Sequence, residues 1–506
     1  KMRNYALFSV NIIEDIEWFG KVLNERGCSL IATEKPLTRL RAAGIQAISV
    51  EEFTGVSGSY PFPPTLHPKI ELALTTDAEE KIHLLYDIPY GLDEGNDVGG
   101  HTLLALAAKG GRIPVCTLED MRAVVRAIEE RGEVPAEEVR RLTLKANLEV
   151  MKHYGEVIQS AGGDVCTLIG SRVYELAGGE NPYQVPAHLL TFRSDDPLSL
   201  DRFELLGEEP PCFTNLADLD ATLETLCKLA LALRDLFGRA PFLTVAAKHG
   251  NPCGIGVDWE SRDGSLEKAL WGNPLALWGG EVIVNFALGT DEARILTHSE
   301  RREKLLGSGK WMLDVIAAPG YEGEASALLG RRKFRKVLLN PALEFSELRR
   351  ESRAFRQVRG GLLCQPPADY ILNLNGVHWT RRAAEADLEA MIIAWAAAFT
   401  SNLGGNEVAL AKKGRLLAVG GGPSTVDAAE TALNRANKYE SASGAVFCAD
   451  AFFPFKDAPE LLVKAGCTGG LVPDGGLRRR EVFEFFAAHG KAVGFIPEEY
   501  RGFCRH

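Results

Sequence analysis

The chain has 506 residues, of which 46% are hydrophobic and 25% charged, a balance typical of a globular protein with about two to four domains. Lys and Arg number 57 against 68 Asp and Glu, and the net charge of −11 argues against nucleic-acid binding. No apolar stretch approaches the roughly 20 residues that span a bilayer, so we expect no membrane contact and no signal peptide. Ten cysteines without a CxxC pair argue against a zinc site or a disulfide framework, and we expect a cytoplasmic location.

The first 50 residues alternate short apolar runs with amphipathic stretches. The sequence predicts strands at 5–10, 28–33 and 46–50, and helices at 13–27 and 36–44 that end at glycines. A helix at 99–111 precedes a strand at 112–117, and residues 118–175 are predicted to be rich in helix. Alternation at this spacing indicates right-handed βαβ units and a parallel sheet.

Residues beyond 178 repeat the α/β alternation twice, although residue identities show no internal repeat. A long helix is predicted at 383–402, and a strand, a glycine run and a helix at 414–436. The predicted fold class is therefore α/β. We expect a domain at 1–145, a helical linker at 146–177, and two subdomains at 178–350 and 351–506.

An apolar run at 242–247 ends in Lys248 and His249 and then breaks at Gly250-Asn251-Pro252. Because successive strand residues face opposite ways, the two basic side chains converge only if the strand ends here. A histidine takes and returns a proton near neutral pH, and a neighbouring ammonium stabilises developing negative charge. From these residues alone, an ordinary tight loop and a catalytic corner both remain open.

Four other stretches allow a ligand-binding and a structural interpretation. VGGGPST (419–425) lies between a predicted strand and helix, where backbone N–H groups bind an anion or simply form a turn. DAFFPFKD (450–457) forms either an aromatic wall for a flat ligand or a core loop. Asp314 stands at the head of a small-residue strand and is able to face a pocket. The basic stretch 331–360 is either a solvated crossover or a surface for an anionic ligand.

These stretches occur in the order of one known family, which the chain resembles over nearly its whole length. It resembles the bifunctional purine-biosynthesis proteins that join AICAR transformylase to IMP cyclohydrolase. The family's Lys-His-x-Asn-Pro-Cys/Ala-Gly pattern is matched by 248–254, its Gly-Glu-Asn-Pro-His-Gln by 179–184, and its Asn-x-x-Asp by Asn215 and Asp218. The resemblance implies an N-terminal methylglyoxal-synthase-like domain and two cytidine-deaminase-like α/β subdomains without their zinc. It also implies an obligate homodimer with transformylase sites at the interface.

The resemblance implies formyl transfer from the co-substrate 10-formyltetrahydrofolate to the 5-amine of AICAR. His249 would move the proton, Lys248 would stabilise the tetrahedral intermediate, and Asn406 would hold the amide and amine, with Asn402 as a competing match. The substrate-binding residues would be Asn181, Asn215, Gly279, Asp314, Phe452, Arg478 and Arg505. Asp457 and Gly476 would contact the folate. No catalytic metal is implied, and a structural monovalent cation stays open.

The sequence of the N-terminal domain differs from that of the family at the positions that bind a phosphate in the family. The family's Thr-Gly-Gly-Thr loop reads Thr33-Glu34-Lys35-Pro36, in which a carboxylate repels phosphate and a proline removes a backbone donor. Pro64 replaces a lysine and Ala105 an arginine, although Asp97 and Lys109 match. We therefore expect the cyclohydrolase activity to be absent.

The transformylase half lacks family arginines before residue 179, after the glycine run, and at Gly502. Each charged hydrogen bond to a buried anion contributes ~1.5–3 kcal/mol, so losing two phosphate contacts weakens nucleotide binding by roughly 100-fold or more. Arg478, Arg501 or Arg505 are the candidates to replace them. Our leading expectation is an AICAR formyltransferase. The alternatives are a diverged folate-dependent formyltransferase with another amine acceptor, and a non-catalytic homologue.

Overall fold

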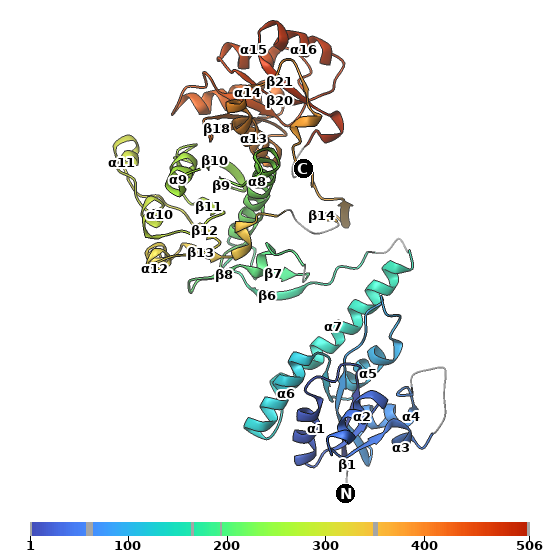
Figure 1. The fold of residues 1–506 in the computed structure, drawn as a ribbon. Helices are drawn as coiled ribbons and strands as arrows, with labels where there is room; N and C mark the ends of the chain where they lie inside the picture. Colours follow the sequence, from blue (N-terminus) through green and yellow to red (C-terminus); the bar gives the residue numbers. More distant parts are fainter. Residues whose placement is uncertain (1–2, 57–63, 163–165, 193–194, 348–352, 503–506) are drawn as a thin grey trace. The chain divides into compact units, whose positions relative to one another are not determined.

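The structure is a computed structural model that describes residues 3–56, 64–162, 166–192, 195–347 and 353–502. The chain divides into two compact units, Lys1–Ile169 and Gly170–His506 (Figure 1). This division falls inside the predicted linker 146–177, whereas residue 145, the predicted end of the first domain, lies within the helix Ala136–Ser160. The predicted boundary between residues 350 and 351 lies outside the described residues.

The first unit is built on a five-stranded parallel sheet with strand order β3-β2-β1-β4-β5. Its elements are β1 Arg3–Ser9, α1 Ile16–Glu25, β2 Ser29–Ala32, α2 Glu34–Ala42, β3 Ala47–Ser49, α3 Val50–Thr54, α4 Pro68–Thr75, β4 Glu80–Asp87, α5 Val98–Lys109, β5 Ile113–Val115, α6 Leu118–Arg131 and α7 Ala136–Ser160. The predicted βαβ alternation and the parallel sheet are confirmed.

Local signals in the sequence explain where most of these elements end. Gly27 and Gly44 follow α1 and α2 with φ angles of 78° and 72°, a conformation that glycine adopts without strain. The prediction of helix-rich structure up to residue 175 is wrong at its end. Gly162, with a φ of 71°, follows the end of α7, and residues 171–175 form a strand, β6, which pairs with β7 at 188–191.

The second unit is built on a continuous 12-stranded mixed sheet with strand order β16-β21-β20-β19-β17-β18-β10-β9-β11-β12-β13-β8. Its elements are β6 Ser171–Glu175, β7 His188–Thr191, β8 Glu204–Leu205, α8 Phe213–Phe237, β9 Phe242–Lys248, β10 Asn251–Asp258, α9 Arg262–Leu270, β11 Glu281–Val284, α10 Thr290–Ile295, α11 Glu300–Leu306, β12 Val315–Ala318, α12 Ala325–Gly330, β13 Lys336–Leu339, β14 Ala354–Val358, β15 Gly361–Gln365, β16 His378–Trp379, α13 Glu385–Thr400, β17 Asn406–Lys412, β18 Arg415–Gly422, α14 Thr425–Asn437, β19 Val446–Ala449, α15 Asp457–Lys464, β20 Gly469–Pro473, α16 Arg479–Ala488 and β21 Ala492–Ile496.

This sheet contains a structural repeat that residue identities do not reveal. Read outward from its centre, the order β10-β9-β11-β12-β13-β8 is matched by β18-β17-β19-β20-β21-β16, with the same parallel and antiparallel pairings. We call residues 204–339 the first repeat and 378–496 the second repeat. β10 and β18 pair antiparallel where the repeats meet, so the start of β10 and the end of β18 lie at the same edge of the sheet.

A long helix precedes the central hairpin of each repeat, α8 in the first and α13 in the second, and the two helices pack together. All residues of α13 from Ala390 to Thr400 are buried, as expected for a helix that is apolar on every side. The hydroxyl groups of Thr225 and Thr400 hydrogen-bond across the two helices at 2.7 Å. One apolar core therefore joins both repeats beneath the shared sheet.

Candidate active site

The Lys248–His249 stretch forms a two-residue hairpin between β9 and β10. Lys248 pairs with Asn251, and the two loop residues, His249 and Gly250, have φ angles of 54° and 65°. This is the left-handed geometry of the tight turns that match strand twist, and it is uncommon for a histidine. The prediction that the strand ends at Lys248 is confirmed. The break after it is a turn into a second strand, because β10 resumes at Asn251.

A pocket of about 210 Å³ lies beside this hairpin, at the heads of β11 and β12. Five of the residues predicted for substrate binding or catalysis line it together: Asn215, Lys248, His249, Gly279 and Asp314. The other lining residues are Cys212, Thr214, Asp218, Glu281 and Phe334. Residues separated by up to 122 positions in the sequence, from Cys212 to Phe334, thus meet at one site.

Lys248 is held in place by backbone carbonyl groups. Its ammonium donates to the carbonyl oxygens of Trp278 and Gly279, both at 2.7 Å. Gly279 has a φ of 68°, and a Cβ atom there would lie 2.8 Å from the Lys248 nitrogen, so this position requires glycine. An ammonium has three N–H donors, and this anchoring leaves the third for a ligand in the pocket.

Asp314 immediately precedes β12, as the sequence indicated. Its backbone N–H donates to the Gly280 carbonyl at 2.8 Å, and its carboxylate lies 3.5 Å from the guanidinium of Arg332. Arg332 belongs to the basic stretch 331–360, which also brings Phe334 to the pocket with 66% of its surface exposed. This part of the basic stretch therefore contributes an aromatic ring to the pocket lining and a cation that pairs with Asp314.

Glu281 lies at the head of β11 and was not identified from the sequence. Its side chain is 1% exposed, lines the pocket, and shares a hydrogen bond with the Asp218 side chain from α8. Burial, followed by the negative charge of Asp218, raises the pKa of Glu281 to about 9. A lone acidic residue after Gly279-Gly280 gives no signal in the sequence, because its burial and its partner depend on the tertiary fold.

Asn251 connects the hairpin to the loop between α13 and β17. Its side-chain oxygen accepts from the backbone N–H of Asn402 at 2.6 Å, and its amide donates to the His249 carbonyl at 2.8 Å. The Asn406 amide instead donates to the carbonyls of Gly422 and Pro423, at 3.3 and 3.1 Å. The loop that carries Asn402 and leads to Asn406 at the start of β17 is thus tied to the hairpin, and both assignments stay open.

The loops of the second repeat lie at the same sheet edge as the hairpin. β17 begins there, and β18, β19, β20 and β21 end there, because the strand directions alternate as the pairings require. Phe452 packs against Gly475 and Gly476, and the guanidinium of Arg501 lies 5.9 Å from its ring. Phe453 is buried whereas Phe455 is 52% exposed, so DAFFPFKD supplies both a core residue and a surface ring.

The remaining predicted residues lie outside the pocket lining. The Arg478 guanidinium lies 5.1 Å from the Phe455 ring, and Asp457 begins α15. Asn181 hydrogen-bonds Gln184 at 2.6 Å within its own exposed loop. This loop is tied to the start of α8, since Phe213 N–H donates to the Gly178 carbonyl at 2.9 Å. Arg505 lies outside the described residues.

The glycine run 419–425 forms the end of β18 and the cap of α14. The Ser424 hydroxyl accepts from the Asp427 N–H at 3.1 Å and donates to the Asp427 carboxylate at 2.6 Å. A side-chain carboxylate therefore already occupies the first turn of this helix, where an anion would bind. The glycine run thus ends a strand and leads into a capped helix, as the structural interpretation of this stretch expects.

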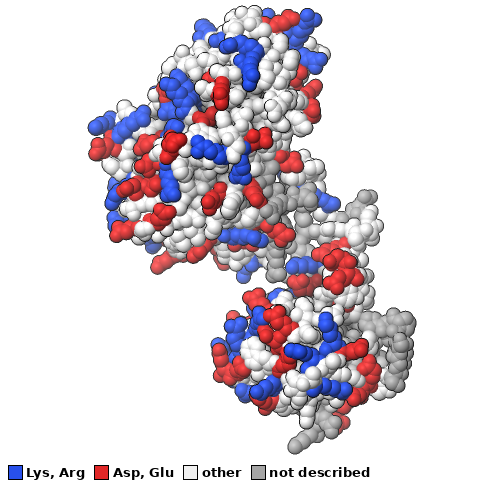
Figure 2. Space-filling model, viewed as in Figure 1, with Lys and Arg blue, Asp and Glu red and all other residues white. Residues whose placement is uncertain are grey.

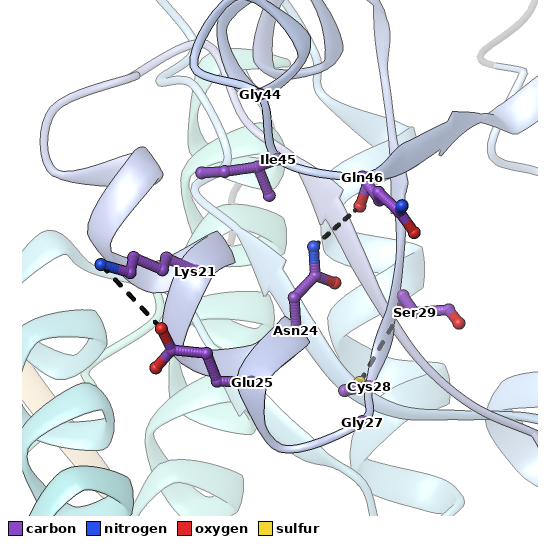
Figure 3. A pocket seen from close by; sticks show the side chains of 9 residues that line it. All are labelled: Lys21, Asn24, Glu25, Gly27, Cys28, Ser29, Gly44, Ile45 and Gln46. Carbon is purple, nitrogen blue, oxygen red and sulfur yellow. Dashed lines mark hydrogen bonds and ion pairs between the residues drawn. The ribbon is translucent and has the colours of Figure 1, made fainter.

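The first unit has a larger surface pocket of about 450 Å³, shown in Figure 3. It is lined by Lys21, Asn24, Glu25, Gly27, Cys28, Ser29, Gly44, Ile45 and Gln46, among which Lys21 pairs with Glu25 and Asn24 with Gln46. These residues lie at the amino ends of β2 and β3, whereas parallel sheets bind ligands at their carboxyl ends. This pocket is therefore not our candidate site.

At the carboxyl end of β2, helix α2 begins directly at Glu34 after its N-cap Thr33. Nearby, Arg122 is paired with Asp15 at 2.7 Å and with Glu14 at 2.5 Å. The carboxylate of Asp97 caps α5, accepting from Gly100 N–H at 2.8 Å. Acidic side chains thus occupy this edge of the first sheet.

Charged side chains are interspersed over the visible face of each unit, with both signs present throughout (Figure 2). Among the described residues, no three His, Cys, Asp or Glu side chains are grouped closely enough to hold a metal ion. No helix in the described ranges is long and apolar enough to cross a membrane.

Comparison with known proteins shows the family of enzymes to which the chain belongs. The family described as AICARFT/IMPCHase bienzyme matches residues 112–435, which is more than half of the chain, and the chain belongs to this family of enzymes. The chain is 26% identical to the bifunctional purine biosynthesis protein PurH of Persephonella marina, and the match covers 98% of each chain. It is 26% identical to PurH of Halalkalibacterium halodurans, again over 98% of both, and 27% identical to PurH of Aquifex aeolicus, over 97% of this chain and 98% of that protein. A solved chain described as "Crystal structure of ForH" is 24% identical over 32% of this chain and 100% of its own, with a TM-score of 0.28.

Proposed function

We propose that this protein transfers the formyl group of 10-formyltetrahydrofolate to the 5-amine of AICAR, in the pocket beside the Lys248–His249 hairpin. One observation supports this proposal above all. In a chain of this family, Lys248, His249, Asn215, Gly279 and Asp314 converge on one pocket from four separate segments.

The chemistry of formyl transfer needs a proton carrier and a stabilised oxyanion. The amine of AICAR attacks the formyl carbon, the new C–N bond forms, and the carbonyl electron pair moves to oxygen. His249 takes the proton that the attacking nitrogen loses, and Lys248 stabilises the oxyanion with its remaining N–H. When the intermediate collapses, the bond from carbon to N10 breaks and N10 receives the proton from His249. Formyl-AICAR and tetrahydrofolate leave, and His249 returns to its starting state.

We extend the proposal to the loops at the same sheet edge. Phe452, Asp457 and Gly476 form the folate side, and either Asn406 or Asn402 holds the amide and amine of AICAR. Arg478 and Arg505 replace the family arginines that are missing around the phosphate, and no catalytic metal takes part. The site works in a cytoplasmic homodimer of chains with a methylglyoxal-synthase-like first unit and two cytidine-deaminase-like subdomains.

We also propose that the IMP cyclohydrolase activity is lost. A phosphate at the carboxyl edge of the first sheet would meet Glu34 in the first turn of α2, where a glycine loop would have offered backbone N–H groups. Arg122, a possible substitute cation, is already paired with Glu14 and Asp15. This edge therefore has little to hold a substrate phosphate.

The test of formyl transfer uses purified protein with AICAR and 10-formyltetrahydrofolate and follows the release of tetrahydrofolate. We expect turnover in the wild type and its loss in His249→Ala, while the control Asp87→Asn in the first unit keeps the wild-type rate. Absence of wild-type turnover with both ligands bound, or full activity in His249→Ala, would overturn the proposal. Conversion of formyl-AICAR to IMP by the wild type would overturn the cyclohydrolase proposal alone.

A further inference from the structure

Two carboxyl groups, those of Glu281 and Asp218, line the same pocket as Lys248 and are not used in the formyl-transfer mechanism. Glu281 heads β11 and is 1% exposed, and its Oε2 atom has no hydrogen-bond partner among the described residues. Its side chain shares a hydrogen bond with Asp218 on α8, and both residues line the pocket. Burying a carboxyl oxygen without a hydrogen-bond partner costs folding free energy, so such a group in a pocket wall is a candidate functional residue.

The charged and titratable groups around Glu281 come from every element packed against it. Lys248 approaches from the end of β9, Asp218 from α8, Asp314 from the residue before β12, and Cys253 from β10. Among these groups, only Lys248 carries a positive charge. The number of protons on the two carboxyls therefore decides how much of the Lys248 charge is available to a ligand.

The second repeat shows that these carboxyls are not needed to hold a lysine in this position. Lys412 ends β17 as Lys248 ends β9, and its ammonium donates to the Ser443 carbonyl at 2.7 Å, the counterpart of the Trp278 contact. The residue that begins β19, in the place of Glu281, is Val446. Anchoring of the lysine is thus a property of both repeats, and the carboxyl pair belongs to the first repeat alone.

We propose that Glu281 and Asp218 act as one proton-sharing pair that fixes a single negative charge beneath Lys248, which makes both of them positioning residues for the formyl transfer proposed above. Two adjacent carboxyls in a buried site do not both ionise readily, so the pair keeps one proton at neutral pH. One negative charge attracts the Lys248 ammonium without cancelling its effect on a ligand. A second one would offset the attraction that the ammonium exerts on the developing oxyanion.

This inference predicts a specific pH dependence for the catalysed rate. Since the pKa of Glu281 is raised to about 9, the wild-type rate constant falls on the alkaline side as Glu281 loses its proton. In Glu281→Gln the position stays neutral at every pH, so this decrease disappears while most of the neutral-pH rate is retained. In Asp218→Asn the neighbouring negative charge is gone, so Glu281 ionises more readily and supplies the single negative charge itself; no second charge forms, and the alkaline decrease disappears here too.

The experiment measures rate against pH for the wild type, both variants and Asp87→Asn, a matched control whose buried carboxyl also has a pKa raised to about 8, but in the first unit. Infrared difference spectra between the wild type and Glu281→Gln report the protonated carboxyl at neutral pH directly. The same alkaline decrease in all four proteins, or no protonated-carboxyl band assigned to Glu281, would overturn the inference. If the wild type does not transfer the formyl group, the proposed function fails, and the infrared band still decides whether the pair holds its proton.

Discussion

The two repeats of the second unit have the same framework and different chemistry at equivalent positions. In each, a β hairpin places a lysine at the end of its first strand, followed by a two-residue turn with positive φ angles: His249-Gly250 in the first and Lys413-Gly414 in the second. A glycine at positive φ faces each lysine, Gly279 with a φ of 68° and Gly444 with a φ of 77°. The framework therefore fixes the lysine in both repeats.

The comparison extends to the opposite end of the same hairpin strands. The Leu243 N–H donates to the Asn285 side chain at 2.7 Å, and the equivalent Glu407 N–H donates to Asp450 at 2.8 Å. Asn285 is therefore a structural residue at the far end of β11. Only the first repeat adds a histidine, Glu281 and Asp314 around its lysine, where the second has Lys413, Val446 and Thr468. These additions, and not the shared framework, distinguish the proposed active pocket from the equivalent place in the second repeat.

Substitution of the first turn residue by alanine should give the largest difference in rate between the two repeats. Removing a positioned proton carrier lowers the rate by roughly 10²–10⁴-fold, so His249→Ala should nearly abolish formyl transfer. Lys413→Ala removes the equivalent side chain in the second repeat and should leave the rate unchanged. Steady-state assays of both variants decide this, and equal losses in the two would remove the distinction between the repeats.

The two anchored lysines form the next matched pair. Loss of an oxyanion-stabilising donor costs roughly 10²–10³-fold in rate, so Lys248→Met should lose that much while Lys412→Met should not. Thermal unfolding should show similar, small changes in stability for the two, because their anchoring contacts are alike. A rate loss confined to Lys412→Met would contradict the assignment of the site.

Alanine substitutions of the glycines that face these lysines should distinguish a loss of stability from a loss of activity. Alanine at either position adopts a strained positive φ, at a cost of about 1–2 kcal/mol in the free energy of unfolding. A Cβ at position 279 would also lie 2.8 Å from the Lys248 nitrogen, against 3.5 Å between position 444 and the Lys412 nitrogen. We expect Gly279→Ala to lose activity as well as stability, and Gly444→Ala to lose stability alone. Urea titration together with rate assays measures both quantities.

Glu281→Val gives the first repeat the residue type found at the equivalent position of the second, and it should change the pH dependence of stability. The folded protein holds a proton on Glu281 up to a pH of about 9, whereas the ordinary pKa of the group is 4.5. Folding therefore binds a proton between these values, and stability falls as pH rises across this range. The variant lacks the pH-dependent contribution of Glu281. The difference in free energy of unfolding, variant minus wild type, should therefore rise by on the order of 1–3 kcal/mol from pH 5 to pH 8. An unchanged difference across that range would show that Glu281 titrates normally.

The sequence predicted much of the framework, because local patterns determine it. Glycines that close α1 and α2, the apolar run of α13 and the strand ending at Lys248 all follow from periodicity and backbone preference. Asp314 was identified because it stands directly before a small-residue strand.

Other features depend on contacts between distant segments and have no local signal. Glu281 gains its burial and its partner only when α8 packs beside β11. The repeat has no clear signal in the sequence, because "AAKHGN" and "LAKKGR" share three of six residues, too short a match to indicate a repeat, although their backbones match. The helical expectation up to residue 175 failed since pairing with β7, a tertiary contact, stabilises β6.

A labelling experiment shows whether the first-repeat pocket transfers a formyl group to AICAR. Protein is mixed with AICAR and 10-formyltetrahydrofolate that carries ¹³C in the formyl group, and the products are analysed by mass spectrometry. We expect labelled formyl-AICAR from the wild type and from Lys413→Ala, and none above background from His249→Ala. Label that stays on the folate in the wild type, or that reaches AICAR equally in His249→Ala, would contradict this expectation.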